Sequence, residues 1–166
     1  MRKIAFLFAL MSFFMTGYIF SNSMKDSAAS HAQSGTVVEF VEPILKPIFG
    51  EQDEEETARK MSIIVRKAAH FAEFTLLGFC VGGFAAAITA IYQKRFSGLS
   101  LGMCFAVASC DEWIQSFVGR TSSIKDVALD LCGSIFGIMV MLLMVNFLPR
   151  KKERALDDVP HDNFDT

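Results

Sequence analysis

The sequence predicts an all-α integral membrane protein, folded as a four-helix bundle with an outer loop that carries a short interfacial helix. Hydrophobic residues make up 52% of the 166 residues, and the mean hydropathy is +0.37. Four stretches approach the ~20 apolar residues that a helix needs to cross a bilayer. These spans are residues 4–20, 71–92, 98–118 and 127–148, and they define one membrane domain over residues 1–148.

The first stretch has features of both a signal peptide and a signal anchor, because Arg2 and Lys3 precede its apolar run. The nearest small-residue cleavage pattern, Ser30-His31-Ala32, begins about ten residues past that run, which is too far for normal processing. The sequence therefore favours a retained helix that anchors the chain in the membrane.

The segment between the first two spans, residues 21–65, is predicted to form the outer loop. Residues 36–49 place apolar side chains at helical spacing, which favours a short helix on the membrane interface, although its two prolines would interrupt or kink it. Residues 51–56 contain five carboxylates, a pattern typical of a solvated tip. The polar tail over 149–166 is predicted to be a disordered cytoplasmic extension.

The basic residues favour a multi-pass topology with both termini in the cytoplasm. The Lys and Arg residues divide evenly between the two sides of the membrane, so their number does not decide the orientation. On the side of the termini they lie close to the spans, as at Arg2-Lys3 and Lys94-Arg95, whereas half of the others lie in the long first loop. Charges in short segments next to spans dominate orientation.

Ionisable side chains occur in or beside three of the four spans, where each costs ~2.5–3.5 kcal/mol on insertion scales and by default marks a functional site. Arg66, His70 and Glu73 open the second span at i, i+4, i+7 spacing, so they share one helical stripe. Polar residues also lie at the end of the third span and the start of the fourth, namely Asp111, Glu112, Gln115, Arg120, Lys125, Asp126 and Asp130. We expect this group to converge on one pocket near the outer side.

Several of these residues also have a purely structural interpretation. Arg66 and His70, near a helix end, can extend to the lipid headgroups. Asp126, near a helix start, can cap the helix or interact with its dipole. Gly133 and Gly137, four residues apart, indicate close packing between helices.

Asp111 and Glu112 are harder to explain in this way. Adjacent side chains on a helix project ~100° apart, so at least one of the two acids faces the bundle interior and requires a cationic partner. The candidate partners are Arg66, His70 and Arg120. A structural salt-bridge network and a ligand-binding or catalytic pocket are both open at this point.

Three blocks of sequence show motifs in a specific order. Phe20-Ser21 follows the first span, and residues 66–74 read RKAAHFAEF, with Leu77-Gly78 behind them. Residues 111–120 read DEWIQSFVGR and are followed by Ser123, Asp126-Val127, Asp130 and Gly133. Over about residues 4–148, the chain resembles the VanZ-like family of bacterial integral membrane proteins. One departure is Asp130, a position where the family often carries Asn.

The resemblance implies four spans in a bacterial plasma membrane. It does not imply a settled biochemical activity; the family takes its name from a member associated with low-level resistance to the glycopeptide teicoplanin. We predict an outer-leaflet pocket that binds or modifies an anionic lipid or a lipid-linked cell-wall intermediate, with an effect on glycopeptide susceptibility. The candidates for acid–base chemistry or cation binding are His70, Glu73, Asp111 and Glu112. The candidate ligand-binding residues are Arg66, Lys67, Gln115, Arg120, Lys125, Asp126 and Asp130.

Two alternative functions are compatible with the same residues. The first is a small transport or translocation protein that uses its intramembrane carboxylates, which would require a homo-oligomer or a membrane partner because four spans without a repeat are few for a transporter. The second is a non-catalytic accessory subunit of an envelope complex. No nucleophile stands out in the sequence, which assigns neither a metal nor a cofactor. Nucleic-acid binding is not expected, because no basic face with interleaved aromatic residues occurs.

Overall fold

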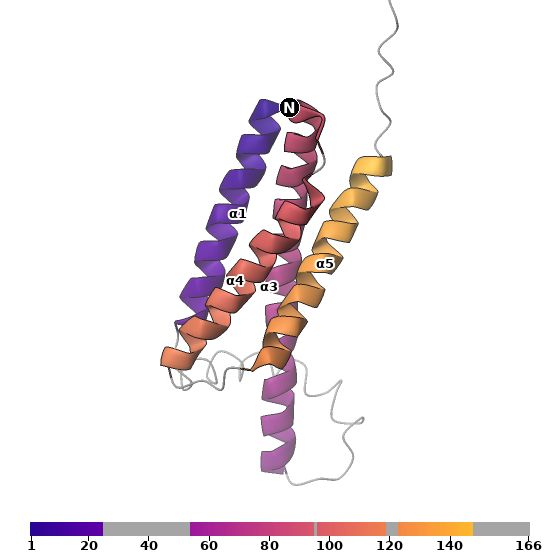
Figure 1. Cartoon of the computed structure of the whole chain (residues 1–166). Helices are drawn as coiled ribbons and strands as arrows, with labels where there is room; N and C mark the ends of the chain where they lie inside the picture. Colours follow the sequence, from indigo (N-terminus) through magenta and orange to yellow (C-terminus); the bar gives the residue numbers. More distant parts are fainter. Residues whose placement is uncertain (25–53, 95, 119–122, 148–166) are drawn as a thin grey trace, which may run out of the picture.

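The computed structural model describes residues 1–24, 54–94, 96–118 and 123–147. Within these residues the chain forms four helices and no strand (Figure 1): α1 over Arg2–Ser23, α3 over Glu54–Tyr92, α4 over Ser97–Phe117 and α5 over Ile124–Phe147. The predicted all-α bundle is therefore confirmed. The predicted interfacial helix over 36–49 and the polar tail over 149–166 lie outside the described residues.

In the described part of the chain, three helices are long and apolar enough to cross a membrane: α1, α3 and α5. The fourth helix, α4, has 21 residues, which is a sufficient length for a span. Its C-terminal part is less apolar, because it carries Asp111, Glu112 and Gln115. The prediction that α4 also crosses the membrane stays a prediction.

The predicted outer loop is too long at its C-terminal end. Residues 54–65, which we assigned to this loop, form the first turns of α3. This segment contains neither Gly nor Pro, and its charged side chains support a helix; Glu56 and Lys60 form an ion pair of 2.8 Å at i, i+4 spacing. Residues 54–60 are mostly polar and lack the apolar run by which the spans were recognised, so the start of this helix was missed.

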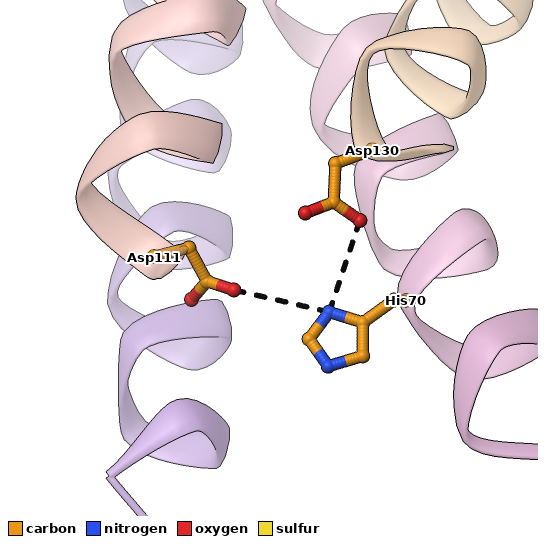
Figure 2. A group of neighbouring side chains, drawn as sticks. All are labelled: His70, Asp111 and Asp130. Carbon is orange, nitrogen blue, oxygen red and sulfur yellow. Dashed lines mark ion pairs between the residues drawn. The ribbon is translucent and has the colours of Figure 1, made fainter. Parts of the chain in front are cut away.

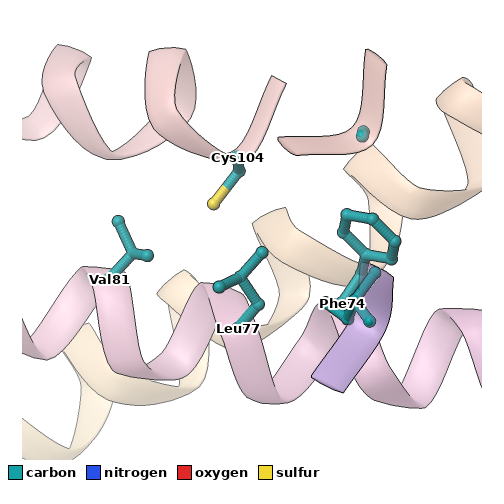
Figure 3. Close-up of a cluster of buried hydrophobic side chains, with 6 residues drawn as sticks. Phe74, Leu77, Val81 and Cys104 are labelled. Carbon is teal, nitrogen blue, oxygen red and sulfur yellow. The ribbon is translucent and has the colours of Figure 1, made fainter. Parts of the chain in front are cut away.

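The long helix α3 is the centre of the bundle. It contacts α1, α4 and α5, and its most extensive interface is with α5. Phe74, Leu77 and Val81 lie along one face of α3, and Figure 3 shows Cys104 of α4 opposite them. Large apolar side chains elsewhere on α1, α4 and α5 are exposed, which is the pattern expected of a surface that faces lipid tails.

Close approach of α3 and α5 depends on glycines. A Cβ atom on Gly137 would overlap the backbone of Thr75, and one on Gly133 would lie 2.6 Å from the carbonyl oxygen of Phe71. Gly78 of α3 meets the backbone of α5 in the same way. Small residues allow helix backbones to approach within membranes, so the packing role predicted for Gly133 and Gly137 is confirmed.

One end of the bundle, called the polar end below, gathers the C-terminal ends of α1 and α4 and the N-terminal end of α5 (Figure 1). At this end α3 passes the other helices and continues beyond them toward its start at Glu54. The N-terminus of the chain lies at the opposite end. The ionisable residues of α3, α4 and α5 are therefore brought to the same end of the molecule.

Candidate functional site: a pocket at the polar end

Side chains from three helices line a pocket at the polar end. The lining residues are Arg66 and His70 of α3, Glu112 and Gln115 of α4, and Asp126, Leu129 and Asp130 of α5. The pocket is small and partly open to solvent. All of these residues except Leu129 are polar, and each polar one is a site residue predicted from the sequence. The structure shows that they meet; the roles assigned to them stay predictions.

Both adjacent acids of α4 are buried, with Asp111 0% and Glu112 5% exposed. Oδ2 of Asp111 accepts a hydrogen bond of 2.7 Å from Nε2 of Gln115, which also lies 3.5 Å from the hydroxyl of Ser23 at the end of α1. Oε2 of Glu112 accepts a hydrogen bond of 2.9 Å from the backbone N–H of Ser123. Both acids therefore have hydrogen-bond partners, as buried polar groups normally do, and Gln115 and Glu112 connect α4 to α1 and to the residue before α5.

His70 lies between two buried carboxylates (Figure 2). Its Nδ1 atom is 3.8 Å from Oδ2 of Asp111 and 3.9 Å from Oδ1 of Asp130. The side chain of His70 is 15% exposed, and Asp130 is only 1% exposed. Both separations exceed the length of a hydrogen bond. The three groups, one each from α3, α4 and α5, therefore surround a small space, and each carboxylate lies within ion-pair distance of a protonated His70.

Basic side chains lie at the rim of the pocket. Arg66, one turn before His70, lines the pocket directly. Nζ of the half-exposed Lys67 forms an ion pair of 3.0 Å with Oδ1 of Asp126. Lys125 was also predicted to bind a ligand, but it is exposed on the first turn of α5 and is not among the lining residues of the described pocket. Arg120 lies outside the described residues.

Glu73 shares the stripe of Arg66 and His70, but its contact is with α1. Its Oε1 accepts a hydrogen bond of 2.8 Å from Nδ2 of Asn22. Three residues beyond His70, a helical side chain is rotated by ~60°, which is enough to turn it from one neighbouring helix to the next. Within the described residues, Glu73 therefore joins α3 to α1 and does not line the pocket.

This link supports a prediction about stability. We expect Asn22→Ala to lower the free energy of unfolding by about 0.5–2 kcal/mol, the range of hydrogen bonds within membranes and of bonds to charged groups. The measurement is unfolding of the purified protein in mixed micelles. The losses from Asn22→Ala and Glu73→Ala should not add up in the double variant, because both remove the same contact. Full additivity would show that the hydrogen bond contributes nothing.

Sequence reasoning missed several contributors to the site. Asn22, Ser23 and Ser123 hydrogen-bond the candidate residues, and Leu129 forms an apolar part of the pocket wall. The adjacent Asn and Ser at the end of the first apolar stretch were an available signal, since polar groups at that position require partners. Leu129 carried no such signal, because a leucine in a membrane span is expected everywhere.

The site combines a surplus of carboxylates with an imidazole and a guanidinium. None of the residues that line the described pocket is a Ser, Thr or Cys, so the lining offers groups for acid–base chemistry or for ligand binding but no hydroxyl or thiol nucleophile. Imidazole and carboxylate groups are also ligands for divalent cations. His70, Asp111 and Asp130 are the residues whose arrangement suits that purpose.

Comparison with known proteins gives one match. No curated protein and no solved structure matches the chain. The model of the VanZ/LLP1 family matches residues 5–145, a range that runs from the first turn of α1 to the last turns of α5 and includes every residue that lines the pocket. The motifs around His70 and Asp111 resemble the same family. The chain therefore belongs to the VanZ/LLP1 family.

Proposed function

We propose that this protein binds the phosphate headgroup of an anionic lipid in the pocket at the polar end. The lipid is either a membrane phospholipid or a lipid-linked cell-wall intermediate. The observation that carries the proposal is the pocket itself, in which α3, α4 and α5 all contribute charged side chains at one end of an apolar bundle. Charged groups near a membrane are expensive to place, so a cluster that is open to solvent points to a polar ligand.

Arg66 is the group best suited to bind the headgroup. It lines the pocket, and a guanidinium can donate two parallel hydrogen bonds to phosphate oxygens. Lys67 at the rim adds positive charge, part of which is offset by Asp126. Leu129 supplies an apolar wall against which the glycerol or acyl part of a lipid would pack.

The depth of the pocket supports a lipid ligand. The apolar stretch of α3 begins next to His70, so the pocket lies where this helix enters the membrane and where lipid headgroups are found. Lipid tails would then extend along the exposed apolar side chains of the bundle. With the predicted topology, this surface belongs to the outer leaflet.

That orientation gives a separate prediction. In a variant without the four native cysteines, a cysteine introduced at Glu54 should react with a membrane-impermeant thiol reagent on intact cells, and one introduced at Lys152 should not. The reason is the density of basic residues beside the spans on the side of the termini. Labelling of Lys152→Cys alone would place the pocket on the cytoplasmic side of the membrane.

The binding test uses purified full-length protein and native mass spectrometry. Phosphatidylglycerol and a polyprenyl phosphate are added in separate arms, with phosphatidylcholine as the reference, so that the two sources of the phosphate are distinguished. We expect Arg66→Ala to lower the affinity for the preferred anionic lipid by about 10- to 100-fold, the range for one charge-assisted hydrogen bond. Arg66→Lys should restore part of the affinity, because it keeps the charge but not the guanidinium.

Arg59 provides the matched control, since it lies on the same helix but is exposed and does not line the pocket. Arg59→Ala should bind anionic lipids like the parent protein. Equal losses from Arg59→Ala and Arg66→Ala would indicate attraction by net charge alone. If no anionic lipid is preferred over phosphatidylcholine, the proposal fails and the accessory-subunit or transport function becomes the better account.

The same variants test the cellular prediction. If the bound lipid is a cell-wall intermediate, the parent protein should lower susceptibility to teicoplanin, whereas Arg66→Ala at equal membrane abundance should not. The measurement is the growth-inhibitory concentration in a host without its own copy of the protein. If the parent protein and Arg66→Ala protect equally, any effect on glycopeptide susceptibility does not depend on lipid binding by Arg66.

A further inference from the structure

We propose that His70, Asp111 and Asp130 form a binding site for one divalent cation beside the pocket, two of whose lining residues are His70 and Asp130. The cation is of the kind that accepts imidazole as well as carboxylate ligands, such as Mn²⁺ or Zn²⁺. The site joins α3, α4 and α5 at the point where their polar side chains meet (Figure 2).

The first support is the spacing of the three donor groups. One ligand atom from each residue can be chosen so that all three lie within 4.8 Å of one another. The distances of 3.8 and 3.9 Å from Nδ1 of His70 to the two carboxylates are too long for hydrogen bonds. They are typical of two ligands on one ion, since bonds of ~2.0–2.6 Å place such ligands about 3–5 Å apart.

The second support is a buried carboxylate oxygen that lacks a hydrogen-bond partner. Asp130 is 1% exposed and lines the pocket, and its Oδ2 atom forms no hydrogen bond within the described residues. Buried polar groups are normally satisfied, and an unsatisfied charged group is especially costly. A cation would supply the missing interaction.

The charges around the site favour the same conclusion. Asp111, Glu112 and Asp130 are all buried, and Asp126 lies nearby on the turn of α5 before Asp130. Among the described residues, the basic side chains near these four carboxylates are Arg66 and His70 in the pocket lining and Lys67 at the rim. A divalent cation among the buried carboxylates would offset part of the negative charge that these described residues carry.

The ligand types narrow the choice of metal. Mg²⁺ and Ca²⁺ are bound mainly by oxygen, whereas Zn²⁺ and Mn²⁺ also accept a histidine nitrogen. Three protein ligands leave at least one coordination position open. A phosphate oxygen of the lipid would bind there; this last step rests on the proposed function, whereas the cation site does not.

The test is a Mn²⁺ titration of chelator-treated, full-length protein in detergent without added lipid, followed by the electron paramagnetic resonance signal of free Mn²⁺. The parent protein should bind one Mn²⁺ per chain, and Zn²⁺ should displace it. Asp130→Asn keeps the size of the side chain but removes its charge, and it should weaken binding at least ~10- to 100-fold, the loss seen when even an outer-shell partner is removed. If this variant does not yield monodisperse protein, His70→Gln carries the same expectation.

Glu56→Gln removes an exposed carboxylate from α3, outside the pocket, and should bind Mn²⁺ like the parent protein. The cation site is wrong if the parent protein binds no Mn²⁺ or if Asp130→Asn and His70→Gln bind it normally. Asp126 is not one of the three proposed ligands. If Asp126→Asn lowers the affinity for Mn²⁺ as much as Asp130→Asn does, the cation site is also wrong, because binding would then reflect net charge.

The result of the Mn²⁺ titration can be interpreted separately from the result of the lipid-binding measurement. Absence of Mn²⁺ binding together with normal binding of anionic lipid would remove the cation site and leave the proposed function intact. Binding of Mn²⁺ without any preference for anionic lipid would support the cation site and remove the proposed function.

Discussion

Gly137→Leu is expected to prevent stable assembly of the bundle. A Cβ atom at Gly137 would overlap the backbone of Thr75, which cannot move away as a flexible side chain would. Overpacking of a core typically costs ~1–3 kcal/mol; here α3 and α5 must separate, so we expect a loss of at least ~3 kcal/mol, a large part of the ~5–15 kcal/mol available to a folded protein. The measurement is the yield of monodisperse protein and its unfolding in mixed micelles.

Gly102→Leu is the matched control for this variant. Gly102 also lies within a helix, α4, but a Cβ atom built there meets nothing within 4 Å. The added side chain would face lipid, so the variant should be as stable as the parent protein. Similar losses from both substitutions would show that helix packing at Gly137 is not the cause.

Asp111→Ala is expected to have the second-largest effect. The carboxylate is completely buried, accepts a hydrogen bond from Gln115 and faces His70. Removing one member of a buried charged group leaves its partners unsatisfied and typically costs ~3–5 kcal/mol. We therefore expect a poorly folded protein that also fails to bind anionic lipid, measured by unfolding in mixed micelles and by native mass spectrometry.

Asp111→Asn separates the loss of folding from the loss of binding. The amide oxygen can still accept the hydrogen bond from Gln115, and the neutral side chain reduces repulsion with Asp130, so this variant should fold. In protein that holds the proposed cation, this variant should nevertheless bind the headgroup more weakly, because it no longer provides a charged ligand for the cation. If Asp111→Asn binds anionic lipid as well as the parent protein does, Asp111 has only a structural role.

The sequence predicted the fold well where an apolar run defines a helix. The ends of α1, α4 and α5 lie within a few residues of the predicted spans, because a change in hydropathy marks each boundary. The start of α3 was placed wrongly, since its first turns are mostly polar up to Lys60 and include the ion pair Glu56–Lys60. Periodicity of hydrophobic residues carries little information about such a polar helix start.

The composition of the pocket followed from the sequence, but its internal geometry did not. Helical spacing placed Arg66 and His70 on one stripe, and the charges near the ends of the predicted spans indicated one end of the bundle. The meeting of His70 with Asp111 and Asp130 also depends on the rotation and depth of three helices. The rotation and depth of each helix are fixed by packing between residues far apart in the sequence, such as Gly137 against Thr75. No local sequence pattern reveals such contacts.

Site-specific photo-crosslinking tests the central claim, that the pocket binds an anionic lipid, most directly. A diazirine analogue of leucine replaces Leu129, which lines the pocket, or Leu142, which is exposed on the same helix ~20 Å away. After irradiation in native membranes, the masses of the adducts identify the lipids at each position. We expect adducts at Leu129 to be enriched in lipids with anionic phosphate headgroups relative to those at Leu142. The same lipid composition at both positions would contradict the account.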